Sequence, residues 1–167
     1  MKIFSHSWSS GSAWLLCLAL LAALVPHLAH ALHFPCWIYL PAHFAPLIAG
    51  LALGRRAGGL VGLVVVVSDA IGGHLKPAQL LPLACELPTY GFISGLLASR
   101  SRNWVSTLYC LLAAQLAGRL AYLLPALILG KPVLRSLRGL FIYPWPGLLL
   151  QVILIPPLVL LITRQAR

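Results

Sequence analysis

The chain has 167 residues, of which 60% are hydrophobic and only 8% are charged, with Lys+Arg 12 against Asp+Glu 2. A soluble domain carries about 25% charged residues, so this composition excludes an ordinary water-soluble protein and predicts an integral membrane protein. The basic residues occupy short breaks between apolar runs and do not form one surface, which favours membrane lipid as the surroundings and argues against nucleic acid as a partner.

Apolar runs near the length of about 20 residues that a spanning helix needs follow one another along the chain. The sequence predicts an all-α integral membrane protein, a compact bundle of six transmembrane helices at residues 13–32, 41–54, 57–75, 80–98, 104–129 and 144–163. The predicted flanks are a cytoplasmic N-terminal segment (1–12), a cytoplasmic tail (164–167) and one long polar loop (130–143).

The N-terminal run has a second interpretation. Residues 15–25 followed by Ala29-His30-Ala31 are also typical of a secretory signal peptide with its cleavage site, so removal of residues 1–31 stays an open alternative.

The distribution of charge predicts the orientation in the membrane. Six crossings place both termini on one side, and cytoplasmic loops carry the excess of Lys and Arg. The side with the termini holds seven such residues and the opposite side holds four: Lys2, Arg55, Arg56, Arg100, Arg102, Arg164 and Arg167, against Lys76, Lys131, Arg135 and Arg138. We therefore expect a multi-pass membrane protein with both termini in the cytoplasm.

Ionisable residues inside the predicted helices gather in the outer half of the membrane. With a rise of about 1.5 Å per residue, Asp69 lies roughly 18 Å, His27 roughly 21 Å and Arg119 roughly 22 Å above the inner ends of their helices. Glu86 lies roughly 9 Å below an outer end. Such groups are costly in a bilayer and mark functional sites by default, so this layer predicts a polar pocket that opens outward and binds a small-molecule substrate. Pairing of Arg119 with Asp69 or Glu86 for structural reasons is the alternative, and both can hold together.

The histidines allow a different function. His27 and His30 are three residues apart on one helical face and could share a metal ion. A transition-metal or haem permease component that uses the outer-layer histidines is therefore the alternative function, and a structural or assembly membrane protein is a third. The chain contains no H-E-x-x-H, G-x-S-x-G or Walker motif, so we expect neither an enzyme nor a bound cofactor, and any energy for transport must come from a partner or an ion.

Small residues predict close helix contacts. Ala19-x-x-x-Ala23 in the first helix, and Gly58 and Gly59 with Gly62 in the third, allow neighbouring backbones to approach, either within the chain or with a partner.

Four segments, in order along the chain, resemble the substrate-binding S components of energy-coupling factor (ECF) vitamin transporters. They are residues 40–50 (LPAHFAPLIAG), 86–97 (ELPTYGFISGLL), 117–119 (AGR) and 146–156 (PGLLLQVILIP). The resemblance implies six helices in the bacterial cytoplasmic (inner) membrane, an outward-facing pocket for a vitamin or similar cofactor precursor, a transmembrane coupling subunit and ATPase subunits. It also implies that Ala19 and Ala23 contact the coupling subunit.

The resemblance also indicates which residues bind the substrate. His43, Glu86, Tyr90, Arg119 and Gln151 lie in the matching segments, and the polar and aromatic residues of the same layer add His30, Trp37 and Asp69. Residues 67–77 depart from the family pattern, so the substrate class can differ there, with Asp69 and His74 as the positions of interest. The sequence does not name the substrate.

Overall fold

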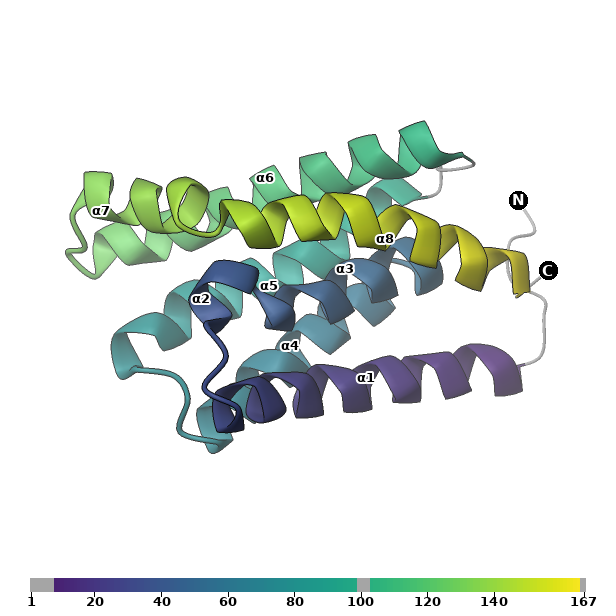
Figure 1. The fold of residues 1–167 in the computed structure, drawn as a ribbon, viewed down its shortest axis with the longest axis horizontal. Helices are drawn as coiled ribbons and strands as arrows, with labels where there is room; N and C mark the ends of the chain where they lie inside the picture. Colours follow the sequence, from purple (N-terminus) through teal and green to yellow (C-terminus); the bar gives the residue numbers. More distant parts are fainter. Residues whose placement is uncertain (1–7, 99–102, 166–167) are drawn as a thin grey trace.

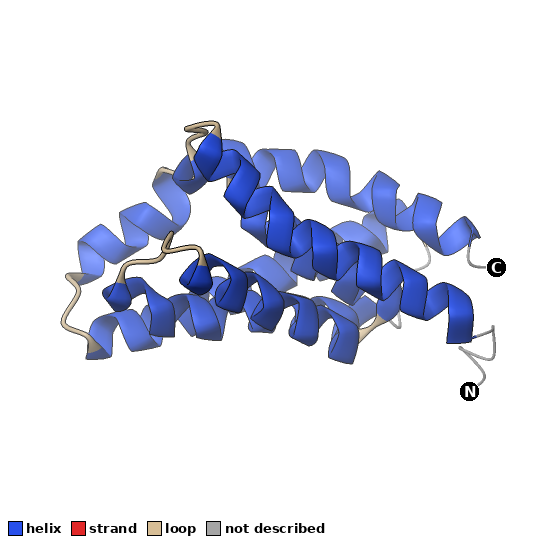
Figure 2. Ribbon diagram, turned by 90° about the horizontal axis from the view of Figure 1, so that it is seen from below, coloured by secondary structure: helices blue, strands red, loops and turns tan. Residues whose placement is uncertain are grey.

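The computed structural model describes residues 8–98 and 103–165, and every regular element within those ranges is helical (Figure 2). The elements in chain order are α1 (Trp8–Ala31), α2 (Cys36–Tyr39), α3 (Pro41–Leu53), α4 (Arg55–Ile71), α5 (Pro77–Leu97), α6 (Trp104–Ile128), α7 (Val133–Leu137), the π-helical turn η2 (Arg138–Ile142) and α8 (Trp145–Gln165). The prediction of an all-α protein is confirmed for these residues.

The six long helices run side by side in alternating directions, as Figure 1 shows. The first turn of α1 and the last turn of α8 consequently lie at the same end of the bundle. We call the opposite end the α7 end; it carries α2, α7, η2 and the turn between α4 and α5 (Figure 1).

Five stretches are long and apolar enough to cross a membrane, judged by length and composition among the described residues: Ser12–Ala31, Cys36–Leu53, Pro77–Leu97, Trp104–Ile128 and Val133–Thr163. The short helix α2 extends α3 to the length of a span. Helix α4, with 17 residues, is not among these stretches.

Glycine and proline explain most differences from the predicted boundaries. Gly54, with φ of 100°, lets α3 pass directly into α4, which therefore starts at Arg55 and not at residue 57. At the other end, α4 stops at Ile71, before the predicted residue 75, because Gly73 adopts φ of 71°. Helix α5 begins earlier than predicted because Pro77 occupies its first position, where the missing N–H is harmless.

The prediction that residues 130–143 form a loop is wrong, since α7 and η2 make most of this segment helical. Pro132 begins the segment, and Ser136 and Leu140, one turn apart, are its buried side chains. At the N-terminus, α1 starts at Trp8, inside the segment that the sequence predicts to precede the first helix, and the rest of that segment lies outside the described residues. Of the predicted tail, 164 and 165 continue α8.

Helices α3, α4 and α5 touch through their backbones. A Cβ atom at Gly62 would lie 2.5 Å from the Leu87 carbonyl oxygen, and one at Gly58 would collide with the Gly91 carbonyl oxygen. Gly59, by contrast, approaches α5 only to 3.9 Å, an ordinary contact distance. Gly58 and Gly62 thus provide the close approach that their sequence pattern predicts, and Gly59 does not.

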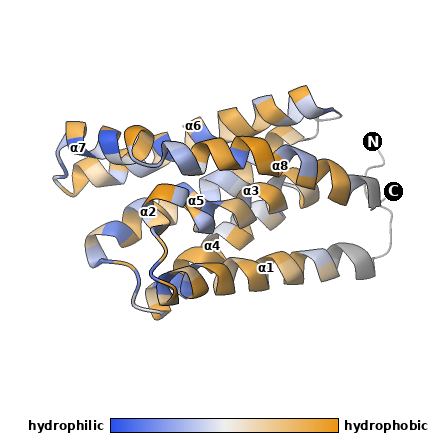
Figure 3. Ribbon diagram, in the orientation of Figure 1, coloured by the Kyte–Doolittle hydropathy of each residue, from blue (hydrophilic) through white to orange (hydrophobic). Residues whose placement is uncertain are grey.

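The outer surface of the bundle is apolar. Leu16, Leu20, Leu24 and Leu28 form an exposed row along α1, and similar rows follow α6 and α8. Figure 3 shows hydrophobic residues along the long helices and hydrophilic ones gathered toward the α7 end. Exposed apolar surface of this extent is far beyond the scattered positions normal for a soluble monomer.

Candidate functional site

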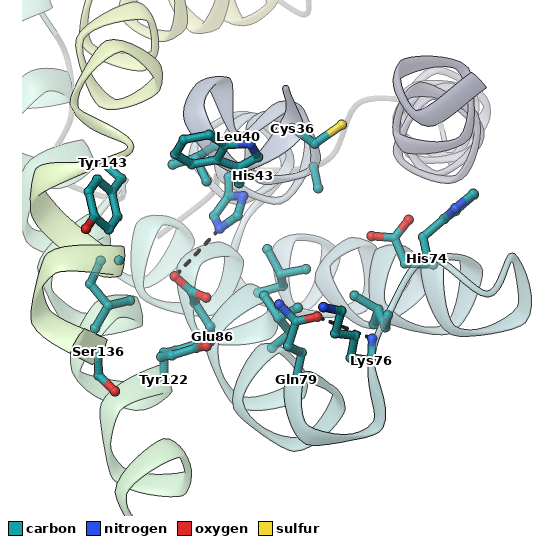
Figure 4. A pocket seen from close by; sticks show the side chains of 18 of the residues that line it. Cys36, Leu40, His43, His74, Lys76, Gln79, Glu86, Tyr122, Ser136 and Tyr143 are labelled. Atoms are coloured by element: carbon teal, nitrogen blue, oxygen red, sulfur yellow. Dashed lines mark hydrogen bonds and ion pairs between the residues drawn. The ribbon is translucent and has the colours of Figure 1, made fainter. Parts of the chain in front are cut away.

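A cavity of about 610 Å³ opens at the α7 end, between α2, α3, α5, α6 and α7. Its volume lies within the roughly 300–1,000 Å³ of small-molecule sites. Figure 4 shows side chains from all these elements turned toward the same space. Polar and aromatic residues of its wall include His30, Trp37, His43, Asp69, His74, Lys76, Gln79, Glu86, Arg119, Tyr122, Lys131, Arg135, Ser136 and Tyr143.

Glu86 is the centre of a buried charge cluster at the floor of this cavity. Its Oε1 accepts hydrogen bonds from Arg119 Nη1 at 3.1 Å and from the Tyr90 hydroxyl at 3.0 Å, and His43 Nε2 lies 3.6 Å away. Tyr90 follows Glu86 by one turn of α5, which puts both side chains on one face. Glu86 is 1% exposed and Arg119 4%, so the ion pair has left water. The predicted pairing of Arg119 with a carboxylate is therefore present, and the partner is Glu86.

The cluster leaves polar atoms without partners. Arg119 Nε and Nη2, both ring nitrogens of His43 and Asp69 Oδ1 are buried and make no hydrogen bond within the described structure. Buried polar groups in folded proteins are nearly always paired. All three residues belong to the cavity wall, so the unpartnered atoms lie on residues that line the cavity.

A second group lies beside the first, around Asp69 on α4. His74 Nε2 is 2.7 Å from His27 Nδ1, the rings of His30 and His74 stack at 4.2 Å, and Ser68 Oγ is 2.9 Å from His27 Nε2. His27 and His30 are thus brought together through His74. No group of three His, Cys, Asp or Glu side chains placed to hold a metal ion occurs in the described ranges, so the metal alternative gains no support from this group.

Two of the predicted substrate-binding residues lie behind the cavity wall. Tyr90 is 1% exposed and holds Glu86 from below. Gln151 is equally buried and accepts a hydrogen bond from Gln115 Nε2 at 2.9 Å. The structure brings the other six predicted residues into one wall: His30, Trp37, His43, Asp69, Glu86 and Arg119.

Three wall residues served in the sequence analysis only as loop charges that predict the orientation of the protein in the membrane: Lys76, Lys131 and Arg135. Lys131 Nζ donates to the Tyr122 hydroxyl at 3.3 Å. One signal in the sequence could have found them, namely that three of the four basic residues on the predicted outer side lie next to helix ends which also carry the buried charges.

Aromatic rings border the cavity at α2 and just after η2. Trp37 is 63% exposed, and its ring meets the edge of Tyr143 at 6.1 Å. Tyr143 also belongs to the wall. A large apolar ring so exposed at a cavity is free to cover a ligand.

The residues predicted to contact a coupling subunit, Ala19 and Ala23, lie on α1 and are half-buried. Ala19 packs against the hydrophobic core, and the Ala23 carbonyl accepts a hydrogen bond from Ser68 Oγ of α4 at 3.1 Å. This stripe therefore takes part in packing within the chain, and the row of leucines beside it is the exposed face of α1.

Comparison of the chain with protein-family models, with curated proteins and with solved structures found no match.

Proposed function

We propose that this chain crosses a bacterial cytoplasmic membrane with six helices and captures a small organic molecule in the cavity at the α7 end. The observation that carries the proposal is the cavity itself: a site of about 610 Å³ with a buried ion pair and unpartnered polar atoms, on a bundle whose outer surface is apolar.

The exposed leucine rows support the membrane part of the proposal, because lipid tails are the solvent in which such a surface is stable. Helix α4, with 17 residues, is about 26 Å long. That is close to the hydrocarbon thickness of about 30 Å, and a small mismatch is accommodated by local thinning of the bilayer. The charge bias in the sequence puts the α7 end outside and both termini in the cytoplasm.

Tight packing below the cavity supports capture over conduction. On the inner side of Tyr90, the backbones of α3, α4 and α5 meet at Gly50, Gly58 and Gly91, where no room is left even for a Cβ atom. A site open above and closed below suits a binding subunit that hands its cargo to another protein.

The resemblance to S components of ECF transporters supplies the rest of the proposal. The cargo would be a vitamin or similar cofactor precursor, and a transmembrane coupling subunit with ATPase subunits would drive its release inside. The chain has no nucleotide-binding motif of its own, which agrees with this division of labour.

Native mass spectrometry of the gently purified full chain tests the binding function. We expect one small organic molecule that is bound at one copy per chain and is released on denaturation. If no molecule copurifies, and no compound from a panel of vitamins raises the melting temperature, the binding function is wrong and a structural or assembly role takes its place.

Coupling needs a separate test, because Ala19 is half-buried. We compare Ala19→Trp with Leu20→Trp, whose side chain is 55% exposed on the neighbouring face of α1. If α1 docks on a coupling subunit through the alanine stripe, Ala19→Trp abolishes uptake while ligand binding and melting temperature persist. A lower melting temperature with lost binding assigns Ala19 to internal packing and removes it from the coupling surface.

A further inference from the structure

We propose that the molecule captured in this cavity is an organic anion, and that Arg119 holds its anionic group through the Nε and Nη2 edge. This inference rests on the proposed binding function and names the class of substrate.

The guanidinium of Arg119 makes a hydrogen bond within the chain through only one of its three nitrogens. Nη1 bonds Glu86 Oε1 at 3.1 Å, whereas Nε and Nη2 are buried without any hydrogen-bond partner. These two nitrogens form one planar edge with parallel N–H donors, which matches a pair of oxygens in a carboxylate or phosphate. Glu86 is then a positioning residue: it occupies one nitrogen and fixes the plane of the other two.

The cavity wall carries more positive than negative charge. Four cationic side chains line the cavity (Lys76, Arg119, Lys131 and Arg135), against the two carboxylates Asp69 and Glu86. These two are the only acidic residues of the whole chain. Because Glu86 already accepts from Arg119, the three remaining cations outnumber the one remaining carboxylate. A cation would therefore meet a repulsive wall, and an anion an attractive one.

The positions of these cations separate two tasks. Arg119 is 4% exposed on α6, deep in the wall, where low dielectric strengthens a bond to an anion. Lys76 lies in the turn between α4 and α5. Lys131 lies just before α7 and Arg135 lies on α7, so that all three are at the open end of the cavity. Charges there attract an anion from solution and raise its rate of entry, and salt screens this effect.

The other wall residues indicate the chemistry of the rest of the ligand. Leu40, Leu83, Leu87 and Leu140 supply apolar surface, and Trp37 and Tyr143 supply rings at one side. Asp69 Oδ1 is the one buried carboxylate oxygen in this wall that lacks a partner, so it accepts from a hydroxyl or amide N–H. The expected ligand is a largely apolar acid with at least one hydrogen-bond donor distant from its anionic group.

Matched pairs of compounds test the charge of the ligand on the full chain purified in mild detergent. The carboxylate pairs are nicotinate with nicotinamide, biotin with biotinamide and pantothenate with panthenol. A phosphate arm compares pyridoxal phosphate with pyridoxal, and inorganic phosphate is added alone. Thermal shift titrations and equilibrium dialysis give the affinities, and the exact mass of any copurified molecule identifies whether it carries an acidic group.

We expect at least one acid to bind ten times or more tightly than its neutral partner. Arg119→Lys keeps the charge but removes the planar edge, and should reduce that preference at least tenfold. Arg135→Gln, at the exposed rim, should weaken the acid severalfold at low salt and less at high salt. Arg56→Gln, an exposed cation at the opposite end, is the matched control and should change nothing.

Several results would overturn the anion proposal. Neutral compounds that bind as tightly as their acids, a copurified molecule without an acidic group, or acid preference unchanged in Arg119→Lys would each do so while leaving the binding function intact. If Arg119→Lys fails to fold, Arg135→Gln and the copurified mass still decide. Absence of both a copurified molecule and any binding counts against the proposed function itself, and this inference falls with it.

Discussion

The pair formed by Glu86 and Arg119 allows stability to be separated from binding. Glu86→Gln is nearly isosteric, and its amide oxygen still accepts from the Tyr90 hydroxyl and from Arg119 Nη1, which contact Oε1 at 3.0 and 3.1 Å. The variant nevertheless leaves the Arg119 charge buried without a counter-charge. Breaking a buried pair costs about 3–5 kcal/mol, and because the hydrogen bonds persist we expect about 3 kcal/mol here.

The double variant Glu86→Gln/Arg119→Met removes both charges and fills the volume with an apolar chain of similar length. Replacing a whole buried pair in this way is often neutral, so stability should return close to the starting value. For a chain of this size, about 3 kcal/mol corresponds to about 6–12 °C in melting temperature. We therefore expect a clear loss in the single variant and a near-complete recovery in the double variant.

Binding should not recover. Truncating a partner of a buried, hydrogen-bonded charge in a site costs about 2–5 kcal/mol of affinity, which is more than tenfold. The assay measures melting curves in detergent together with retention of the copurified molecule for the same three proteins. A double variant as unstable as the single one would refute the energetic coupling of the pair. Normal binding by both variants would make the pair purely structural, and the site would have to be rebuilt around His30, His43, Asp69 and His74.

Three further predictions use other parts of the structure. For topology, Arg138→Cys at the exposed α7 end should react with an impermeant thiol reagent on intact cells, and Arg56→Cys should react only after permeabilisation; the reverse pattern contradicts the orientation. For packing, Gly58→Leu must separate α4 from α5 and should prevent folding. Gly59→Leu, where an added Cβ atom has no neighbour closer than 3.9 Å, should melt near the wild-type temperature; equal tolerance of both variants disproves the backbone contact. For the second layer, Gln151→Leu leaves its buried hydrogen-bond partner unpaired and should cost about 1–3 kcal/mol of stability without changing the compounds that bind, so altered selectivity would return Gln151 to the site.

Much of the architecture follows from sequence alone, because the elements are determined by local properties. Uninterrupted apolar runs form helices wherever backbone polar groups must be satisfied without water, and this argument predicted the long helices of the structure. Their ends follow glycine and proline, as at Gly54 and Pro77. The pairing of Glu86 with Tyr90 is local too, since residues four positions apart on a helix share a face.

What only the tertiary structure decided is which side of each helix faces the cavity. In the sequence, Gln151 and Arg119 are equally good candidates, since both are polar residues inside apolar helices. In the structure Gln151 contacts Gln115 and Arg119 contacts Glu86, because the rotation of α6 and α8 about their axes depends on the neighbouring helices. In the sequence Lys131 and Arg135 are loop charges, whereas in the structure α7 and the residues just before it bring both to the same cavity wall as Arg119. A helix is specified by contacts within a few residues, whereas a binding site is made of contacts between helices that are far apart along the chain, and those depend on how the whole bundle packs.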